Sequence, residues 1–212
     1  MTPFSQASFI ASVGKLDQLP PEGAPEIVFA GRSNVGKSSA INILAKRRRL
    51  AFVSKTPGRT QTINFYDLGM RGRLVDLPGY GYARVPHAIR SQWDELIGGY
   101  LRARTSLAAV VLIMDARQPC KPKDMAVIEW IAPLASRILV LLSKSDKLSR
   151  AEGQRVLGET RHQLGSRAPG TQVRLFSSVT GEGVDEVRTL LERWLTDANR
   201  PARNKKAPGK GE

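Results

Sequence analysis

The sequence of 212 residues lacks several features that would place it in a specialised class. It has one cysteine, Cys120, so neither an internal disulfide nor a zinc site built on cysteines is available. Its longest unbroken apolar run, residues 107–114, is far shorter than the ~18 residues of a membrane-spanning helix. Residues 1–13 also lack the basic start and apolar block of a secretion signal. We therefore expect a cytoplasmic protein with no membrane insertion.

Acidic residues are few relative to basic ones. Asp and Glu total 19 against 33 Lys and Arg, which gives a formal net charge of +14. Such an excess favours polyanionic partners, because a basic surface displaces the counterions that surround them. Nucleic acid is the first partner to consider. A soluble surface that is merely basic is the alternative explanation.

The composition is otherwise that of a globular protein, with 41% apolar and 25% charged residues. We expect an irregular N-terminal arm over residues 1–25, packed on the domain, because prolines and glycines gather at its end. The folded domain should cover residues 26–197. Residues 198–212 should form a disordered basic tail, since they contain no apolar residue larger than alanine and several Lys and Arg.

Short β-rich runs alternate with segments of helical period across residues 26–197. This pattern predicts an α/β fold of three layers, with helices on both faces of a mostly parallel sheet. The expected strands are residues 27–30, 63–67, 74–75, 107–114, 138–142 and 173–176. The clearest expected helix has one apolar stripe, formed by Val184, Val187, Leu190, Leu191, Trp194 and Leu195. The other expected helices are residues 39–44, about 89–102, and a segment that begins after Ser149.

A glycine-rich segment follows the first expected strand. It reads Gly31, Arg32, Ser33, Asn34, Val35, Gly36, Lys37 and Ser38. This matches the phosphate-binding pattern G-x-x-x-x-G-K-[ST], with the required strand before it and helix after it. Its backbone N–H groups should face a phosphate, Lys37 should reach the β- and γ-phosphates, and Ser38 should bind Mg²⁺. The segment predicts a nucleoside triphosphate site; a chance glycine-rich turn is the alternative.

Two further segments fit the metal and the γ-phosphate. The first follows strand 74–75 and reads Asp76, Leu77, Pro78 and Gly79. Its carboxylate suits the Mg²⁺ shell and its glycine N–H suits the γ-phosphate, although an ordinary tight turn could have the same sequence. The second is the polar loop of residues 56–62, in which a threonine could close onto Mg²⁺. Thr56, Thr60 and Thr62 are the candidates, and a loop with no metal role is the alternative.

The identity of the base depends on the ends of two later strands. Residues Ser143, Lys144, Ser145 and Asp146 follow strand 138–142. An aspartate at this edge can accept two hydrogen bonds from guanine, for which adenine has no matching donor pair. Lys144 would lie along the base, and the backbone of Phe176, Ser177 and Ser178 could donate to guanine O6. A charged turn between strand and helix is the alternative.

Taken together, GRSNVGKSS, TPGRTQTINFY, VDLPGYGYA, SKSD and FSS resemble the Era-like group of translation-factor-class GTPases. More narrowly, they resemble the EngB (YihA or YsxC) family of bacterial ribosome-biogenesis GTPases, over about residues 26–194. The resemblance implies a six-stranded P-loop GTPase fold that binds GTP or GDP with Mg²⁺. It implies catalytic roles for Lys37 and Thr60, with Thr60 joining Ser38 on the metal. It also implies nucleotide contacts in the loop of Gly58, Arg59, Thr60, Gln61 and Thr62.

The sequence departs from the better-known GTPase pattern at two residues, and at a third residue it matches several relatives. Tyr80 follows the D-x-x-G segment where many signalling GTPases have a water-positioning glutamine, so we expect slow hydrolysis without a partner. Ser143 replaces the usual Asn or Thr, so base specificity should rest chiefly on Asp146. Asn34 stands where several relatives bind K⁺ beside the phosphates, although a local turn hydrogen bond is equally compatible with it.

The resemblance also implies partners. It points to a monomeric switch that binds the precursor of the large ribosomal subunit and its rRNA, and whose loss disturbs cell division and septation. The basic run of residues 46–49 and the basic tail could contact rRNA. One alternative is an RNA-binding module whose P-loop site is not a switch. A P-loop kinase for a small molecule ranks last, because SKSD and DLPG indicate a guanine switch.

Overall fold

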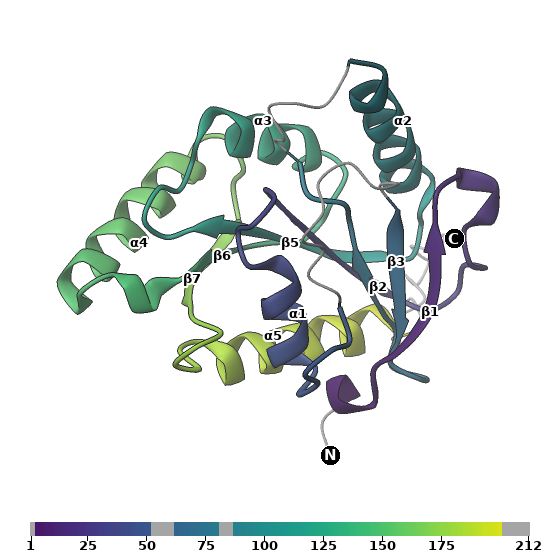
Figure 1. The fold of residues 1–212 in the computed structure, drawn as a ribbon, viewed down its shortest axis with the longest axis horizontal. Helices are drawn as coiled ribbons and strands as arrows, with labels where there is room; N and C mark the ends of the chain where they lie inside the picture. Colours follow the sequence, from purple (N-terminus) through teal and green to yellow (C-terminus); the bar gives the residue numbers. More distant parts are fainter. Residues whose placement is uncertain (1–2, 52–61, 81–86, 201–212) are drawn as a thin grey trace, which may run out of the picture.

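The computed structural model describes residues 3–51, 62–80 and 87–200, and between residues 87 and 94 it describes the backbone alone. A seven-stranded sheet lies between two layers of helices (Figure 1). On one face lie α1 (Lys37–Leu44) and α5 (Val184–Ala198), and on the other lie α2 (His87–Ala103), α3 (Pro122–Ile131) and α4 (Arg150–Gly165). The predicted three-layer α/β fold is confirmed.

The sheet is mixed, with one reversed strand. Its strands are β1 (Ser8–Val13), β2 (Glu26–Gly31), β3 (Ile63–Asp67), β4 (Arg73–Asp76), β5 (Leu107–Asp115), β6 (Ile138–Ser143) and β7 (Gln172–Phe176). They lie in the order β1-β3-β4-β2-β5-β6-β7. β3 is antiparallel to both of its neighbours, and every other pair is parallel.

The prediction of six strands was wrong by one, because β1 forms in the N-terminal segment that we expected to be irregular. β1 pairs with β3 from Ser8 opposite Asp67 to Val13 opposite Ile63. Phe9 and Ile10 are both exposed, so the segment lacks the alternation of buried and exposed residues by which a strand is recognised in sequence. The segment nevertheless packs on the domain, since Phe4 and Ala7 before β1 are fully buried. The proposed domain boundaries stay a prediction.

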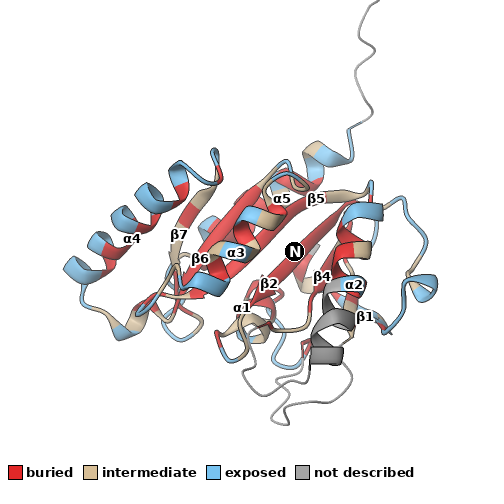
Figure 2. Cartoon of the chain, turned by 90° about the horizontal axis from the view of Figure 1, so that it is seen from above, coloured by how far each residue is buried: buried red, intermediate tan, exposed pale blue. Residues whose placement is uncertain are grey.

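The core consists of two apolar clusters, one on each face of the sheet. β2 and β6 are buried along their whole length, as strands covered on both faces require (Figure 2). All six residues of the predicted stripe on α5 are buried in the cluster that this helix shares with α1. The sequence prediction for α5 is therefore confirmed.

The remaining helices agree with expectation except for one. α4 begins after Ser149, whose hydroxyl accepts a hydrogen bond from the N–H of Glu152 at 3.3 Å in a capping box. α3 was missed, because the prolines around Cys120 indicated a loop. Pro122 is instead the first residue of α3, a position where a missing N–H costs the helix nothing. Three short 3₁₀ segments complete the described part: η1 (Pro3–Gln6), η2 (Leu16–Gln18) and η3 (Ser145–Lys147).

The parallel arrangement determines where the predicted motifs meet. β4, β2, β5, β6 and β7 all run in the same direction, so their carboxyl ends share one edge of the sheet. In open α/β sheets, ligands bind at this edge. Within the described residues, no helix has the length and apolar character needed to cross a membrane.

Candidate functional site

The phosphate-binding segment turns sharply from β2 into α1. Gly36 is the N-cap of α1 and has a φ of 101°, in the left-handed region that favours glycine. Asn34 also has a left-handed φ of 62°, which asparagine tolerates better than most residues. The turn directs the first N–H groups of α1, which have no acceptor within the helix, to the carboxyl edge of the sheet. Such a turn can hold a phosphate.

The D-x-x-G segment runs directly beside this turn. The N–H of Leu77 donates to the carbonyl of Phe29 at 3.0 Å. The N–H of Tyr80 donates to Gly31 at 3.2 Å, and the N–H of Ser33 donates to Tyr80 at 3.1 Å. The pairing of β2 with β4 therefore continues past the end of β4 into the glycine-rich segment, and the two predicted motifs are held together by backbone hydrogen bonds.

Gly79 is required by this close approach. A Cβ at Gly79 would lie 2.9 Å from the Ser33 hydroxyl oxygen and 3.1 Å from the Ser33 Cα. The second contact is with backbone, which cannot swing away as a flexible side chain could. Pro78 completes the segment beside it. The glycine of the D-x-x-G motif thus lies against the phosphate-binding turn.

Lys37 and Asp76 meet at the centre of the edge. The Lys37 amine forms an ion pair with the Asp76 carboxylate, and Asp76 is only 5% exposed. Ser38, the predicted metal ligand, is the next residue of α1. The described residues contain no group of three or more His, Cys, Asp or Glu side chains that could hold a metal. A carboxylate and a hydroxyl fit Mg²⁺, which takes few protein ligands and completes its shell with phosphate oxygens and water.

The predicted guanine-binding residues lie at the ends of β6 and β7. The Ser177 hydroxyl donates to one Asp146 carboxylate oxygen at 2.7 Å and accepts from the N–H groups of Val179 and Thr180 at 3.1 Å. This hydrogen bond, opposed by desolvation, lowers the pKa of Asp146 below its usual range. Asp146 therefore stays ionised and its loop is tied to the loop that begins after Phe176.

Lys144 connects this end of the site to the phosphate-binding turn. Its amine donates to the Asn34 carbonyl at 2.9 Å and to the Asp115 carboxylate at 3.0 Å. Arg117 donates two further bonds to Asp115, at 2.9 and 2.7 Å. Desolvation raises the pKa of Asp115, but these hydrogen bonds outweigh it and hold the pKa well below the usual range. Sequence reasoning missed Asp115 and Arg117, although a carboxylate at the end of β5 was a usable signal.

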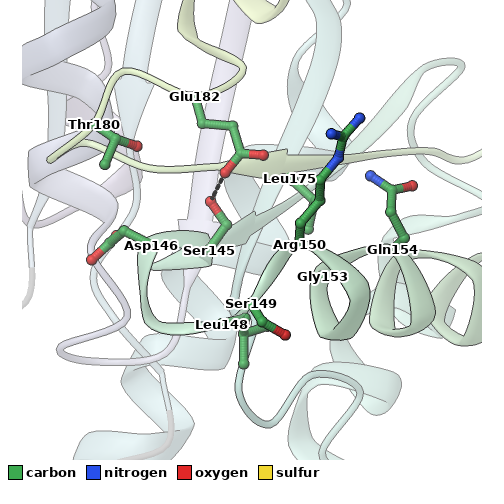
Figure 3. Close-up of a pocket in the computed structure, with 10 residues that line it drawn as sticks. All are labelled: Ser145, Asp146, Leu148, Ser149, Arg150, Gly153, Gln154, Leu175, Thr180 and Glu182. Atoms are coloured by element: carbon green, nitrogen blue, oxygen red, sulfur yellow. Dashed lines mark hydrogen bonds between the residues drawn. The ribbon is translucent and has the colours of Figure 1, made fainter.

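Ser145 belongs to a second small network. Its hydroxyl donates to the Glu182 carboxylate at 2.5 Å, and the two residues line a hollow of about 250 Å³ beside the start of α4 (Figure 3). The Asp146 carboxyl points away from Arg150 and Gln154 on the far side of this hollow (Figure 3). Glu182 was also missed, because nothing in its neighbourhood in sequence indicates a partner beside β6.

The described site residues thus gather at one edge, with two qualifications. Thr62 hydrogen-bonds Asn64 at 3.3 Å and lies 3.1 Å from the Ser12 hydroxyl on β1, so its side chain takes part in the packing of β1 on β3. The other threonine candidates, Thr56 and Thr60, lie outside the described residues. The same is true of Gly58, Arg59 and Gln61 and of the tail from residue 201 onward.

Comparison with known proteins agrees with this geometry. A family model described as "50S ribosome-binding GTPase" matches residues 26–144. A protein of Azoarcus sp. (strain BH72), named "Probable GTP-binding protein EngB", is 53% identical over 92% of this chain and 94% of its own length. A protein of the same name from Dechloromonas aromatica (strain RCB) is 48% identical over 98% of this chain and 96% of its own length.

Solved structures show the same fold. One described as a probable GTP-binding protein engB has a TM-score of 0.65 and 22% identity, over 81% of this chain and 99% of its own. A variant of Aquifex aeolicus Era bound to GDP.AlF4- has a TM-score of 0.61 and 17% identity, over 88% of this chain and 60% of its own. Together with the site geometry, the sequence relationships show that this chain is a GTPase that belongs to the EngB family of GTP-binding proteins.

Proposed function

We propose that this GTPase is a slow nucleotide switch that binds the large ribosomal subunit precursor during its assembly. By the family resemblance, normal cell division and septation depend on that role, which would be carried out by a monomer in the cytoplasm. One observation carries the switch: backbone hydrogen bonds join Leu77 of the D-x-x-G segment to Phe29 of β2, and join Tyr80, directly after that segment, to Gly31 and Ser33 of the phosphate-binding turn. A γ-phosphate bound to that turn would therefore act directly on the conformation of the segment after β4.

Five residues carry the phosphate and metal chemistry in this proposal. The Lys37 amine leaves Asp76 to bind the β- and γ-phosphates, and the N–H of Gly79 donates to the γ-phosphate. Ser38 and Thr60 bind Mg²⁺ while the γ-phosphate is present. The metal would neutralise charge that develops on the phosphate oxygens. Once Lys37 has left it, the Asp76 carboxylate would orient the ligand shell of Mg²⁺.

The base would be read by residues of the two loops after β6 and β7. Asp146 accepts from guanine, and the Ser177 hydroxyl holds its carboxylate in place at 2.7 Å. Lys144 lies along the base while its amine holds the phosphate-binding turn through Asn34. A backbone N–H near Ser178 donates to guanine O6. The Ser177 hydroxyl also shapes this loop, because it accepts from two backbone N–H groups that follow Ser178.

Slow hydrolysis is supported by the place of Tyr80. Tyr80 is only 7% exposed, and its hydroxyl donates to Asp124 at 2.9 Å. A buried ring fixed in this way cannot position a water molecule as a glutamine amide does. Faster hydrolysis would then need a partner, or a monovalent cation that replaces part of the charge of an arginine finger. Asn34, which is exposed beside the turn, is the proposed contact for K⁺.

The ribosomal partner is supported by charge as well as by family. Lys46, Arg47, Arg48 and Arg49 are all exposed directly after α1, at the end of the helix that begins in the phosphate-binding turn. Such a run can contact RNA phosphates. The run follows a helix that starts at the proposed nucleotide site, so nucleotide-dependent changes could reach it.

Sedimentation with purified ribosomal particles tests the proposal. We expect the wild-type chain to bind particles about tenfold more tightly with a non-hydrolysable GTP analogue than with GDP, within the usual range of allosteric coupling. Lys37→Ala should abolish this difference. Equal binding in both nucleotides, unchanged by Lys37→Ala, would instead favour an RNA-binding module whose nucleotide site is not a switch.

A further inference from the structure

Three elements that are distant in sequence meet at one buried carboxylate. Asp124, in the first turn of α3, is 0% exposed. One of its oxygens accepts from Arg32 Nε at 3.0 Å and from the Tyr80 hydroxyl at 2.9 Å. The other oxygen accepts from the N–H of Lys121 at 3.2 Å, which closes the capping box of α3. A residue of the phosphate-binding turn and the residue after D-x-x-G therefore share one acceptor.

The three partners satisfy both oxygens of this carboxylate. A buried carboxylate is stable only when it is paired and its oxygens accept hydrogen bonds, and Asp124 meets both conditions. Burial, followed by the charge and hydrogen bond of Asp124, raises the pKa of Tyr80 far above its usual value. The Tyr80 hydroxyl therefore keeps its proton and remains a donor to Asp124 at any physiological pH.

Gly79 lies within the framework that this network holds. The backbone of Tyr80 is bonded on both sides to the phosphate-binding turn, through Gly31 and Ser33. The side chains of Tyr80 and Arg32 are bonded to Asp124. Tyr80 is therefore held through both its backbone and its side chain, and the peptide group of Gly79 immediately before it is held against Ser33. The other end of the turn is held separately, by Ser143 and Lys144.

We propose that Asp124 is a positioning residue for the γ-phosphate, which acts by holding Tyr80 and Arg32 so that the Gly79 N–H faces the third phosphate. This inference rests on the proposed role of Gly79. It predicts a specific asymmetry: GTP binding and hydrolysis depend on Asp124, whereas GDP binding does not. GDP has no third phosphate, and the part of the turn that holds its phosphates is secured from the other side by Ser143 and Lys144.

A second tyrosine and carboxylate pair supplies a matched control. The Tyr100 hydroxyl donates to the fully buried Glu26 at 2.7 Å, and Arg104 donates to the same carboxylate at 3.0 Å. The chemistry is the same, a buried carboxylate shared by a tyrosine and an arginine. Glu26, however, is the first residue of β2, at the opposite end of the strand from the phosphate-binding turn. Removing the Tyr100 hydroxyl should affect folding stability without distinguishing GTP from GDP.

The test compares Tyr80→Phe, Asp124→Asn, the double variant and Tyr100→Phe. Affinities for GDP and for a non-hydrolysable GTP analogue are measured by calorimetry in Mg²⁺, together with single-turnover GTP hydrolysis. We expect Tyr80→Phe and Asp124→Asn each to weaken binding of the analogue about tenfold and GDP by less than about twofold, since the first removes a hydrogen bond to a charged group and the second removes the charge of its acceptor. The double variant should lose less than the two single losses combined, because both substitutions act on the same hydrogen bond.

The outcomes separate this inference from the proposed function. If the wild-type chain binds guanine nucleotides but Tyr80→Phe weakens both equally, or weakens neither, Asp124 has no positioning role. The same conclusion follows if Tyr100→Phe changes the ratio of the two affinities as much as Tyr80→Phe does. If the wild-type chain binds neither nucleotide, both proposals fail. Should Asp124→Asn not fold, Tyr80→Phe still decides, because it removes one hydroxyl and keeps the buried ring.

Discussion

The Ser143 hydroxyl lies 2.6 Å from the carbonyl oxygen of Val35, a residue of the phosphate-binding turn. It also lies 3.0 Å from the carbonyl of Met114, a residue of the neighbouring strand β5. Ser143 is buried. A single hydroxyl thus connects the strand end that precedes Asp146 to the turn that should hold the phosphates, and it joins the two halves of the nucleotide site.

Replacing this hydroxyl should weaken nucleotide binding without changing base preference. Ser143→Ala leaves a carbonyl of the turn without a donor, which costs about 1 kcal/mol and should reduce GDP affinity several-fold. Ser143→Thr keeps the hydroxyl and should restore most of the affinity. Calorimetric titration with GDP measures both variants, and Ser166→Ala, at an exposed serine, is the control. Full affinity in Ser143→Ala would show that the bond does not hold the turn.

Base preference should depend on Asp146. Asp146→Asn removes the paired acceptor for guanine and offers an amide donor that suits the second carbonyl of xanthine. We expect GDP affinity to fall at least about 100-fold, because hydrogen bonds to a charged group contribute about 1.5–3 kcal/mol each. Affinity for xanthosine diphosphate should rise. Competition between the two nucleotides measures the change, with Asp17→Asn, at an exposed aspartate, as the control. Unchanged GDP binding would remove Asp146 from the base site.

The pH dependence of stability should report on Asp115. Its pKa in the folded chain is held below its usual value of 3.8 by hydrogen bonds from Arg117 and Lys144, in spite of desolvation. A lowered pKa stabilises the folded state above pH 3.8, and that contribution is lost as the pH falls through the folded-state pKa. Urea unfolding of wild type and Asp115→Asn should therefore differ at neutral pH and converge in strong acid. A constant difference across this range would contradict the prediction.

Particle binding should be sensitive to salt, and part of that sensitivity should reside in the run after α1. Arg47, Arg48 and Arg49 are exposed, whereas Lys46 has a left-handed φ of 53° and is left in place. Replacing the three arginines with alanine should lower the slope of log affinity against log salt by about 2 to 3, since each phosphate that an arginine neutralises adds roughly 0.9 to it.

A control for this variant removes the same charge elsewhere. Arg150, Arg155 and Arg193 are exposed on α4 and α5, and their replacement with alanine should leave the slope nearly unchanged. If both variants lower the slope equally, particle binding depends on the net charge of the protein and not on a particular surface. Binding that does not vary with salt would exclude phosphate contacts altogether.

Hydrolysis should be slow and should respond to the monovalent cation. With Tyr80 fixed on Asp124, we expect single-turnover GTP cleavage well below about 1 s⁻¹, the low end of kinase turnover. If Asn34 contacts K⁺, cleavage should be faster in potassium than in sodium, and Asn34→Ala should remove the difference. Equal rates in both salts would favour the simpler role of Asn34 in its left-handed turn.

The sequence alone was sufficient for the fold class and for the nature of the site. The spacing of the phosphate-binding segment is local, and the burial of α5 follows from one apolar stripe. These predictions succeeded because each depends only on residues that are near each other in sequence. Sequence reasoning failed for β1 and α3. β1 depends on backbone hydrogen bonds with β3, which is distant in sequence. α3 begins at Pro122, and a proline is compatible with a helix only in its first turn, so the prediction needed to know where the helix begins.

Tertiary structure alone decided how the motifs are joined. The bonds from Arg32 and Tyr80 to Asp124, from Lys144 to Asp115 and from Ser145 to Glu182 each connect residues on different elements. The sequence shows which chemical groups a side chain has, but it does not show which residue the side chain contacts. The contacts depend on how the ends of the parallel strands align at one edge of the sheet. The sequence thus determined which groups could bind a nucleotide, and the packing of the sheet and helices determined which of them hold one another in place.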